Sequence, residues 1–341
     1  MFEQELAATA AAMVAPGKGI LAIDESSGTI KKRFDTIGVE SSVETRRAYR
    51  DLLITGNGLS QYISGVILYD ETIRQATVDG TPFAEVMKKN GILPGIKVDT
   101  GAKDLAGAPG EQVTEGLDGL RERLAEYKKL GAAFAKWRAV INVGKAIPTS
   151  GCIEANAHAL ARYAALCQEA GIVPIVEPEV IMDGDHTLER CFEVTEATLR
   201  TVFDQIYRQR ARTEHLVLKA SMVIAGKSCP QQAGIRQVAD ATVQCLKRAV
   251  PSSVPGIVFL SGGQSDELAT AHLNEMNASG ARLAWPLSFS YGRALQAPAL
   301  KAWKGQPGNV AAAQKALLHR AKCNSAACAG RYSAAMEKDA A

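Results

Sequence analysis

The stretches FAKWRAV (134–140), CIEANAHALARYAALCQEAG (152–171) and IVPIVEP (172–178) follow one another and contain the repeating unit of this chain. The outer two are short runs rich in apolar and β-branched residues, as in buried strands. The middle one is amphipathic and ends in Gly, as a helix often does. A strand, a helix and a second strand in this order predict two parallel strands joined by a helical crossover.

The same unit recurs along most of the chain. VTEGLDGLRERLAEYKKLGA (113–132) and DELATAHLNEMNASG (266–280) are two further predicted amphipathic helices. Each interval between successive predicted strands can hold a loop and a helix. The eight predicted strands are GILAID (19–24), SGVILYD (64–70), PGIKVD (94–99), FAKWRAV (134–140), IVPIVEP (172–178), HLVLKAS (215–221), GIVFLSG (256–262) and RLAWPLSFS (282–290).

Length alone, at 341 residues, fits either two domains or one large barrel. Eight alternating units favour one closed barrel over an open doubly wound sheet. An open sheet that binds a dinucleotide carries GxGxxG after its first strand, whereas DESSGTIKKRF (24–34) follows it here. We therefore predict an α/β fold, a single-domain (β/α)8 or TIM barrel over 1–341. Its core would lie at about 15–300, with extra C-terminal helices and a mobile tail at 301–341.

The charges exclude several classes of partner. The chain has 39 Lys and Arg against 36 Asp and Glu, a net charge of +3, and these charges are mixed rather than gathered into a basic stripe. We therefore expect no nucleic-acid partner, and any anionic partner should be small. Residues 1–19 carry acids where a secretory signal has basic residues. No apolar run approaches the roughly 20 residues of a membrane span, so we expect a cytoplasmic protein with no membrane contact.

The cysteines and histidines predict neither a metal site nor a cofactor. The seven cysteines form no CxxC pair, and the five histidines show no HExxH or paired spacing. We interpret the cysteines as reduced thiols in packing roles. Asp183, Asp185 and His186 could imitate a ligand cluster, but we interpret them as the cap of a helix that starts near Thr187.

Charged residues occur within or at the ends of five otherwise apolar predicted strands. Active residues of a barrel come from the C-terminal ends of its strands. Residues i and i+2 share a face of a strand, so Lys136 and Arg138 should point the same way, as should Glu177 and Glu179. Ion pairs at the barrel rim are the alternative for any one residue; five strands together favour a catalytic cavity. The residues concerned are Asp24, Lys97, Lys136, Arg138, Glu177, Glu179 and Lys219.

Lys219 is the strongest candidate for a nucleophile. It lies in HLVLKAS (215–221), and Met-Val-Ile follows, so its amine is held in apolar surroundings. Desolvation and a nearby cation both favour the neutral amine, which can attack a carbonyl. Lys136 could be that cation. A carboxylate such as Glu177 could then move protons while a carbinolamine forms and breaks down.

Two segments predict a phosphate site. LSGGQSDE (260–267) places glycines between a strand and a helix, where backbone N–H groups and the helix N-terminus favour an anion. A tight turn is the alternative for this segment alone. SFSYGRAL (288–295) follows the next strand, and loops after the seventh and eighth strands usually hold phosphate in such barrels. The candidates are Ser261, Gly262, Gly263, Ser290, Gly292 and Arg293.

A second anion site is predicted at the opposite end of the cavity. SSGTIKKRF (26–34) follows the first strand and carries the hydroxyls of Ser26 and Thr29 and the guanidinium of Arg33. A solvated basic helix face is the alternative for Lys31 and Lys32. The candidates for the second site are Ser26, Thr29, Arg33 and, from the third strand, Lys97.

With these motifs in place, the sequence resembles the class I, Schiff-base-forming fructose-bisphosphate aldolases. The matching stretches occur in order and cover roughly residues 15–330. The resemblance implies a metal-independent, homotetrameric lyase of glycolysis and gluconeogenesis that reversibly cleaves fructose 1,6-bisphosphate to dihydroxyacetone phosphate and glyceraldehyde 3-phosphate. The stretches are GKGILAIDESSGTI, ETRRAYRDLL, LPGIKVDTGA, GAAFAKWRAV, IVPIVEPEVIMDGDH, VLKASMV, GIVFLSGGQSDE and SFSYGRALQ.

The resemblance also implies a role for each candidate. Lys219 is similar to the lysine that forms the imine, Glu177 to the group that dehydrates the carbinolamine, and Asp24 to the acceptor of the C4 hydroxyl proton. Lys136, Glu179 and Arg138 occupy supporting charged positions. The C1 phosphate is implied at Ser261, Gly262, Gly263, Ser290, Gly292 and Arg293, and the C6 phosphate at Ser26, Thr29, Lys97 and Arg33. A protonated imine accepts the electrons of the broken bond, so the chemistry needs no metal.

The sequence departs from the family pattern in two places. Ala220 and Ser221 follow the lysine where many members have Pro-Asn, which should change loop packing rather than chemistry. Animal members end in a tyrosine that assists proton exchange at the enamine, whereas the last tyrosine here, Tyr332, lies nine residues from the terminus. We therefore expect another group to protonate the enamine, or a slower step.

Two other functions are weighed against this one. A different Schiff-base sugar-phosphate aldolase, or a transaldolase-like enzyme, fits the lysine-in-strand pattern, but two phosphate ends favour a bisphosphate. A non-catalytic scaffold with the same fold is disfavoured, because buried charges are costly and a scaffold does not need them.

Overall fold

The structure is a computed structural model, and it describes residues 2–280 and 282–340. Eight of its strands pair in parallel. These strands are β1 (Gly19–Ala22), β2 (Ile63–Leu68), β3 (Leu93–Lys97), β6 (Phe134–Ile141), β7 (Val173–Val180), β8 (Val217–Ala220), β9 (Ile257–Phe259) and β10 (Leu287–Tyr291). They close in the order β1-β10-β9-β8-β7-β6-β3-β2, with β1 and β2 also paired. The predicted α/β barrel is confirmed.

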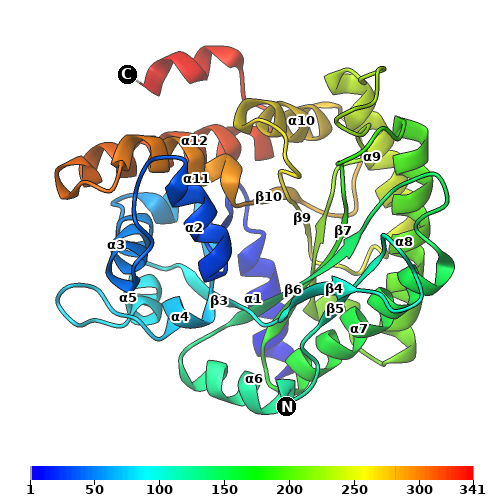
Figure 1. Cartoon of the computed structure of the whole chain (residues 1–341), viewed down its shortest axis with the longest axis horizontal. Coiled ribbons are helices and arrows are strands. Elements are labelled where there is room, and N and C mark those ends of the chain that lie inside the picture. Colours follow the sequence, from blue (N-terminus) through cyan, green and yellow to red (C-terminus); the bar gives the residue numbers. More distant parts are fainter. Residues whose placement is uncertain (1, 281, 341) are drawn as a thin grey trace.

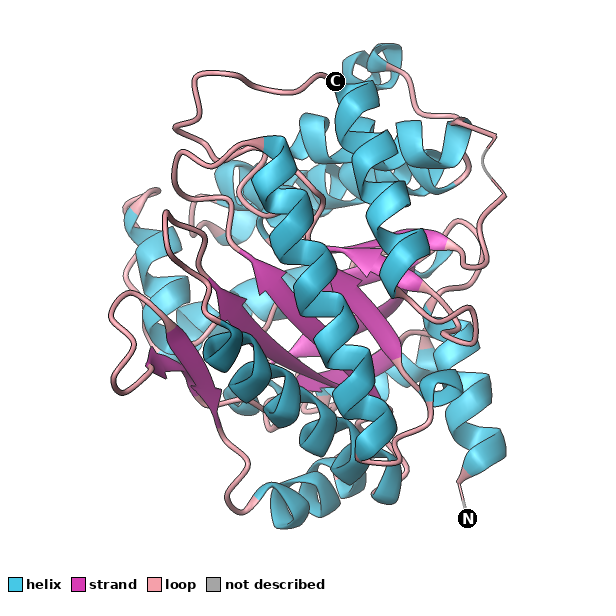
Figure 2. Cartoon of the chain, turned by 90° about the vertical axis from the view of Figure 1, so that its right-hand side faces the viewer, coloured by secondary structure: helices cyan, strands magenta, loops and turns pink. Residues whose placement is uncertain are grey.

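Helices surround the barrel and connect its strands (Figure 1). They are α1 (Glu3–Met13), α2 (Ser27–Asp35), α3 (Val43–Ile54), α4 (Asp70–Ile73), α5 (Phe83–Lys89), α6 (Leu120–Lys129), α7 (Ser150–Glu169), α8 (Leu188–Arg208), α9 (Ile235–Ala249), α10 (Asp266–Ala278), α11 (Arg293–Trp303) and α12 (Val310–Cys328). Short 3-10 helices occur at Leu59–Gln61, Thr213–His215, Pro307–Asn309 and Ala334–Ala340. Figure 2 shows long helices packed along the outside of the strands.

Two details differ from the sequence prediction. The eighth strand begins at Leu287 rather than Arg282, because Pro286 has no N–H for a strand ladder. The expected helix over 113–132 begins only at Leu120. Its first part is instead the strand β5 (Gln112–Glu115), which pairs antiparallel with β4 (Gly101–Asp104) in a hairpin outside the barrel. Alternation over four residues is too short a pattern to separate from a helix start.

Every second side chain along each strand points into the barrel and fills its interior. Ile20 and Ala22 of β1, Val173 and Ile175 of β7, and Phe134 of β6 belong to one buried cluster. The Phe134 ring needs the space beside Gly65 of β2, where a Cβ would lie 2.8 Å from it. Leu6, Ala10 and Met13 of α1 complete this cluster, so the N-terminal helix covers one end of the barrel. The opposite end is left for the loops that follow the strands.

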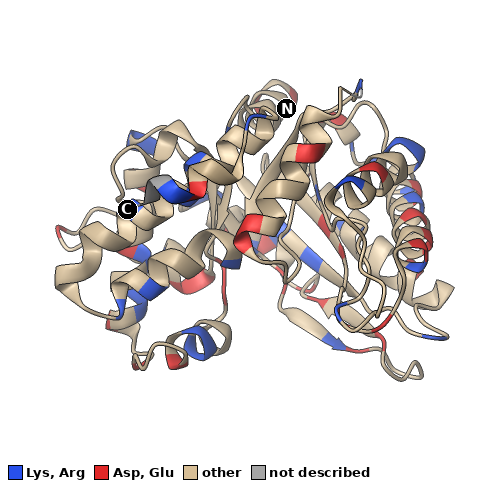
Figure 3. Cartoon of the chain, turned by 90° about the horizontal axis from the view of Figure 1, so that it is seen from above, with Lys and Arg blue, Asp and Glu red and all other residues tan. Residues whose placement is uncertain are grey.

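The other face of each strand packs against the surrounding helices. Ala135, Trp137 and Ala139 alternate with the interior residues of β6 and belong to a second, larger cluster with the helices. Exposed positions of those helices carry charges of both signs, which are interspersed over the outer surface (Figure 3). Within residues 2–280 and 282–340, no helix combines the length and apolarity that crossing a bilayer requires.

The C-terminal helices expected after residue 300 are present, although α11 already starts at Arg293. The tail beyond α12 contains a 3-10 helix, and Glu337 within it is ion-paired with Arg320 of α12. The described part of the tail therefore lies against the barrel's outer helices. The mobility expected of it stays a prediction.

Candidate active site

The interior rows of side chains on β6 and β7 change from apolar to charged as these strands approach the end opposite α1. On β6, Phe134 is followed at steps of two by Lys136 and Arg138. On β7, Val173 and Ile175 are followed by Glu177 and Glu179. Because every second residue of a strand faces the same side, these charged side chains reach the same end of the barrel. The shared orientation predicted for i and i+2 is thereby explained.

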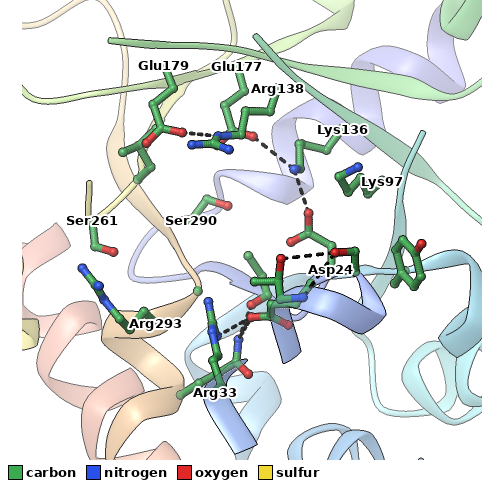
Figure 4. Close-up of a pocket in the computed structure, with 18 of the residues that line it drawn as sticks. Asp24, Arg33, Lys97, Lys136, Arg138, Glu177, Glu179, Ser261, Ser290 and Arg293 are labelled. Carbon is green, nitrogen blue, oxygen red and sulfur yellow. Dashed lines mark hydrogen bonds and ion pairs between the residues drawn. The ribbon is translucent and has the colours of Figure 1, made fainter. Parts of the chain in front are cut away.

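These charged rows open into a cavity of approximately 1370 Å³. All sixteen residues that the sequence analysis selected line it, and Figure 4 shows ten of them around one space. They are Asp24, Ser26, Thr29, Arg33, Lys97, Lys136, Arg138, Glu177, Glu179, Lys219, Ser261, Gly262, Gly263, Ser290, Gly292 and Arg293. The fold therefore brings residues from seven strands or strand ends to one place.

Four ionisable side chains form a chain at the centre of the cavity. Lys219 Nζ lies 3.1 Å from Glu177 Oε1, and Lys136 Nζ lies 3.4 Å from Glu177 Oε2. The same Lys136 Nζ also lies 2.7 Å from Asp24 Oδ2 (Figure 4). Lys136, Glu177 and Lys219 are all at least 96% buried. Glu177 thus stands between two lysines, within proton-transfer distance of the candidate nucleophile.

The pKa values of Asp24 and Lys136 follow from the alternation of positive and negative groups in this series of four side chains. Burial alone would raise the pKa of Asp24, but the positive charges of Lys136 and Lys219 outweigh burial and lower that pKa to about 2. Burial would likewise lower the pKa of Lys136, yet Asp24 and Glu177 raise it above its usual value. Asp24 is therefore an anion and Lys136 a cation at neutral pH. Lys136 is in place as the cation that the sequence analysis expected beside Lys219.

Arg138 of β6 and Glu179 of β7 form a further ion pair, two residues along each strand from Lys136 and Glu177. The backbone N–H of Arg138 also donates to Asp99 Oδ2 at 3.3 Å, and Asp99 Oδ1 lies 2.6 Å from Lys97 Nζ. These contacts tie β6 to the end of β3. The pair is thus placed to support the cavity wall, rather than to reach the nucleophile itself.

The loops after β9 and β10 place the residues predicted to bind an anion on the wall of the cavity. Gly262 and Gly263 adopt positive φ values of 54° and 83°, which turn the chain sharply after Ser261. Arg293 is the first residue of α11, directly after Gly292. Ser290 Oγ is buried and makes no hydrogen bond to any described residue. A buried hydroxyl on the cavity wall without a partner indicates that a ligand supplies one.

One cation at this end was missed in the sequence. A Cβ placed on Gly263 would lie 2.8 Å from Lys227 Nζ and 3.3 Å from an Arg293 guanidinium nitrogen, so both cations border the same loop. Lys227 also pairs with Asp183 at 2.7 Å. It lies in the loop after β8, eight residues beyond Lys219, and that loop is paired with the loop after β7. Its position after a barrel strand was the only available signal.

The loop after β1 is held by a buried carboxylate that was also missed. Glu25 pairs with Arg33 and, at 2.9 Å, with Arg50 of α3. Ser26 caps α2 by accepting a hydrogen bond from the Thr29 N–H. Glu25 neutralises the arginine that the sequence analysis selected, so the resting Arg33 is not an isolated cation. The Arg50 contact leaves Glu25 a partner if Arg33 turns to a ligand.

The two predicted anion sites are less separate than expected. An Arg33 guanidinium nitrogen lies 3.9 Å from where a Cβ of Gly292 would stand, because β1 is the neighbour of β10 in the barrel. Lys97 is better separated. Its strand β3 stands four places from β9 in the ring of eight, and therefore directly across the mouth from Ser261. Lys97 thus marks the far end of the cavity.

Local contacts place the residues of three further expectations, and which group protonates the enamine stays a prediction. The helix expected near Thr187 begins there, and Thr187 itself caps it by accepting a hydrogen bond from the Arg190 N–H. Contrary to the sequence prediction, residues 183, 185 and 186 are therefore not its side-chain cap. Asp183 instead pairs with Lys227. Ser221 exchanges hydrogen bonds of 3.1 Å with the backbone of Val180, which is a packing role. Tyr332 donates to Glu337 and is not among the cavity-lining residues.

Comparisons with known proteins give a consistent result. The family model for fructose-bisphosphate aldolase class-I matches residues 5–341. A probable fructose-bisphosphate aldolase class 1 of Xanthomonas campestris pv. campestris is 65% identical over 330 residues, which are 96% of this chain and 98% of that protein. A fructose-bisphosphate aldolase of Dictyostelium discoideum is 53% identical over 334 residues, covering 97% and 93%.

A solved structure agrees as well. The fructose-bisphosphate aldolase of Plasmodium falciparum, determined in complex with TRAP and a small-molecule inhibitor, superposes with a TM-score of 0.95 at 48% identity. The match covers 97% of this chain and 95% of that one. From the family model over nearly the whole length and relatives of this identity, the chain belongs to the class I fructose-bisphosphate aldolases, a family of lyases.

Proposed function

We propose that this protein reversibly cleaves fructose 1,6-bisphosphate to dihydroxyacetone phosphate and glyceraldehyde 3-phosphate through an imine on Lys219. The observation that carries the proposal is the series of contacts Lys219–Glu177–Lys136–Asp24, which lines the same cavity as the residues predicted to bind the two phosphates. Fructose 1,6-bisphosphate has a carbonyl carbon and a scissile bond between two phosphates. The carbonyl carbon and the scissile bond would therefore lie beside Lys219 and Asp24, with the two phosphates at the predicted anion-binding residues.

Glu177 is assigned the proton transfers of imine formation. At 3.1 Å it accepts a proton from Lys219, and the neutral amine attacks the C2 carbonyl of the open-chain ketose. Glu177 then donates a proton to the carbinolamine hydroxyl, which leaves as water. Lys136, with a raised pKa, remains protonated on the other oxygen of Glu177. The product of these steps is a protonated imine that acts as an electron sink.

Asp24 is assigned the proton of the C4 hydroxyl. As that proton is removed, the C3–C4 bond breaks, C4 becomes the aldehyde of glyceraldehyde 3-phosphate, and the bonding electrons move into the imine to form an enamine. Protonation of the enamine carbon and hydrolysis of the imine then release dihydroxyacetone phosphate and restore Lys219. Lys136 at 2.7 Å keeps Asp24 anionic and oriented between these steps.

Borohydride trapping tests this proposal directly. Reduction in the presence of dihydroxyacetone phosphate should leave a stable adduct, and peptide mapping should find it on Lys219. Cleavage activity should be unchanged by EDTA, because the imine and not a metal ion accepts the electrons. An adduct on another lysine, or no adduct together with EDTA-sensitive cleavage, contradicts the proposal.

The far end of the cavity decides between a bisphosphate and a monophosphate as the preferred substrate. Replacing Lys97 with Met should raise the KM for fructose 1,6-bisphosphate about 10-fold, the lower limit for a charge-assisted contact, because Asp99 already neutralises part of the lysine. The KM for fructose 1-phosphate should change little, because that sugar lacks the C6 phosphate. Steady-state kinetics with both sugars make the measurement. An equal effect on both would remove Lys97 from the C6 site.

Lys227 is proposed as an additional contact of the C1 phosphate. Its side chain is partly exposed and paired with Asp183, so replacing Lys227 with Met should raise KM only about 5-fold, or roughly 1 kcal/mol. In contrast to Lys97→Met, the rise should be the same for fructose 1,6-bisphosphate and fructose 1-phosphate, since both carry a C1 phosphate. A KM unchanged for both sugars would exclude the contact.

The remaining parts of the proposal concern the whole protein. We treat 1–341 as one domain that works in the cytoplasm as a homotetramer. One relative at about 50% identity is described as cytosolic and another as chloroplastic, so compartment varies among relatives. Light scattering coupled to gel filtration should give four times the 36.2 kDa chain mass. A monomer at working concentration would contradict the tetramer.

A further inference from the structure

Three side chains that can ligate a metal meet outside the cavity. His319 and Cys323 lie on α12, and Glu337 lies in the tail that follows it. The imidazole, thiol and carboxylate atoms all lie within 4.8 Å of one another. His319 Nε2 is 3.6 Å from Cys323 Sγ and 3.7 Å from Glu337 Oε2. None of the three lines the aldolase cavity.

The backbone explains why the tail residue joins the helical pair. His319 and Cys323 are four apart on a helix and therefore face the same side. After α12, Gly330 adopts a φ of +64° and the chain reverses, with the Arg331 N–H donating to Ala326. The Tyr332 N–H then donates to the side chain of Asn274 on α10 at 2.9 Å. These contacts return the tail to α12, so Glu337 comes to lie opposite His319.

Two of the three separations between these ligand atoms fit one tetrahedral ion, and the third lies within 4.8 Å. Zinc binds nitrogen and oxygen at about 2.0–2.1 Å and sulfur at about 2.3 Å, so two ligand atoms on the same ion are separated by roughly 3.3–3.8 Å. The two measured separations of 3.6 and 3.7 Å lie within that range. We propose that His319, Cys323 and Glu337 bind a divalent ion of the zinc class, with water as fourth ligand, and so fasten the C-terminal tail to α12.

The surroundings hold the carboxylate in the required orientation. The Tyr332 hydroxyl donates to Glu337 Oε1 at 2.8 Å, and Arg320 donates to Oε2. Such outer contacts commonly orient metal ligands. Oε2 has two lone pairs and can serve both Arg320 and the ion. Arg320 also donates to Thr270 Oγ1 at 2.7 Å and to the Asp266 carbonyl at 3.3 Å, so it stays satisfied if Glu337 moves toward the ion.

Charge and accessibility are compatible with an exchangeable site. The Cys323 thiolate and the Glu337 and Asp266 carboxylates supply three negative charges, against two positive charges of the ion and one of Arg320, which pairs with both carboxylates. Cys323 is fully buried, whereas the side chains of His319 and Glu337 are 13% and 18% exposed, so the ion can enter from the tail side. Arg320 connects the site to the first turn of α10, but the imine chemistry on Lys219 does not use it. The ion should thus act on the tail and leave imine formation unchanged.

Cobalt titration of the chelator-treated, reduced full-length protein is the test. Cobalt has visible bands that report tetrahedral geometry and a charge-transfer band that reports a thiolate ligand. We expect one ion per chain with both signals. Cys323→Ser should abolish the charge-transfer band, and His319→Gln and Glu337→Gln should each weaken binding at least about 10-fold, as loss of even an outer-shell partner can do.

Matched controls separate a lost ligand from a damaged fold. Cys328→Ser changes a cysteine of the same helix, and His158→Gln changes an exposed histidine of α7; both should bind cobalt like the unchanged protein. Tyr332→Phe keeps all three ligands and should weaken binding about 10-fold through the lost hydrogen bond to Glu337. Thermal unfolding of each metal-free variant checks the fold.

Trimming by carboxypeptidase measures the consequence for the tail. Zinc should slow removal of the C-terminal residues severalfold in the unchanged protein and not in Glu337→Gln, the ligand that the tail supplies. Lys219 adduct formation should be the same with and without zinc. The proposal is overturned if no thiolate band forms, if the band survives in Cys323→Ser, or if zinc binds without slowing the trimming.

Discussion

Lys219→Met is expected to abolish imine formation and to lower cleavage of fructose 1,6-bisphosphate by about 10⁴- to 10⁶-fold, the range found when a covalent nucleophile is removed and the binding site remains. Methionine keeps the length and apolar stem of lysine but has no amine to attack the C2 carbonyl. Mass spectrometry after borohydride reduction and steady-state cleavage assays measure the two effects.

The same variant should remain folded, because Glu177 keeps its 3.4 Å contact with Lys136. The loss of stability should be smaller than the about 3–5 kcal/mol that follows when a buried charge is left without a partner. Lys145→Met, at an exposed position outside the cavity, is the matched control and should trap dihydroxyacetone phosphate normally. Trapping that persists in Lys219→Met would remove Lys219 from the proposed role.

Asp24→Asn is expected to slow carbon–carbon cleavage by about 10²- to 10⁴-fold while leaving imine formation intact. A carboxylate with a pKa of about 2 is a weak base. Removing its proton-accepting role alone should therefore slow cleavage by about 10²-fold. Loss of the anion beside Lys136 adds to the effect. Single-turnover cleavage, compared with trapping of dihydroxyacetone phosphate, separates the two steps.

Asp204→Asn, which changes an exposed carboxylate on α8, is the control for this substitution. If Asp24→Asn cleaved at the normal rate, Asp24 would not be the acceptor of the C4 proton. If the variant also failed to trap dihydroxyacetone phosphate, Asp24 would act by positioning Lys136 and Glu177 rather than by taking a proton.

The lowered pKa of Asp24 also gives stability a defined pH dependence. The folded-state pKa of about 2 lies below the ordinary 3.8, so the ionised carboxylate stabilises the folded protein. This contribution of about 2 kcal/mol is present above pH 4 and is lost as the pH falls from about 4 toward 2. Denaturant unfolding over that interval should show the loss in the unchanged protein and a shallower decline in Asp24→Asn.

Strand positions and the central charges could be predicted because both follow local rules. Apolar runs bounded by turn residues located all eight barrel strands, with an error of five residues at the start of β10. Alternation along β6 and β7 correctly placed Lys136 with Arg138 and Glu177 with Glu179 on common faces. A charged residue in the interior-facing row of a barrel strand can face only the cavity. Its presence in the sequence therefore indicated a cavity-lining residue without any further information.

Residues on loops were harder to predict because their partners come from distant parts of the chain. Lys227 borders the loop after β9 only because the loops after β7 and β8 pair with each other. Arg33 approaches Gly292 because β1 closes the barrel against β10, which joins the first strand to the last. Strand β5 was read as the start of a helix, since it is only four residues long.

The sequence by itself determined the repeated strand–helix units, sixteen of the residues that line the cavity and the resemblance to class I aldolases, since periodicity and motif order are properties of the chain. Tertiary structure alone decided which charges touch: that Glu177 stands between Lys219 and Lys136, that Glu25 is shared by two arginines, and that the tail brings Glu337 to His319 and Cys323. Those contacts join residues separated by 8 to 42 positions. Only barrel closure and helix packing fix such separations, and the energies of buried charges depend on distances of a few ångströms.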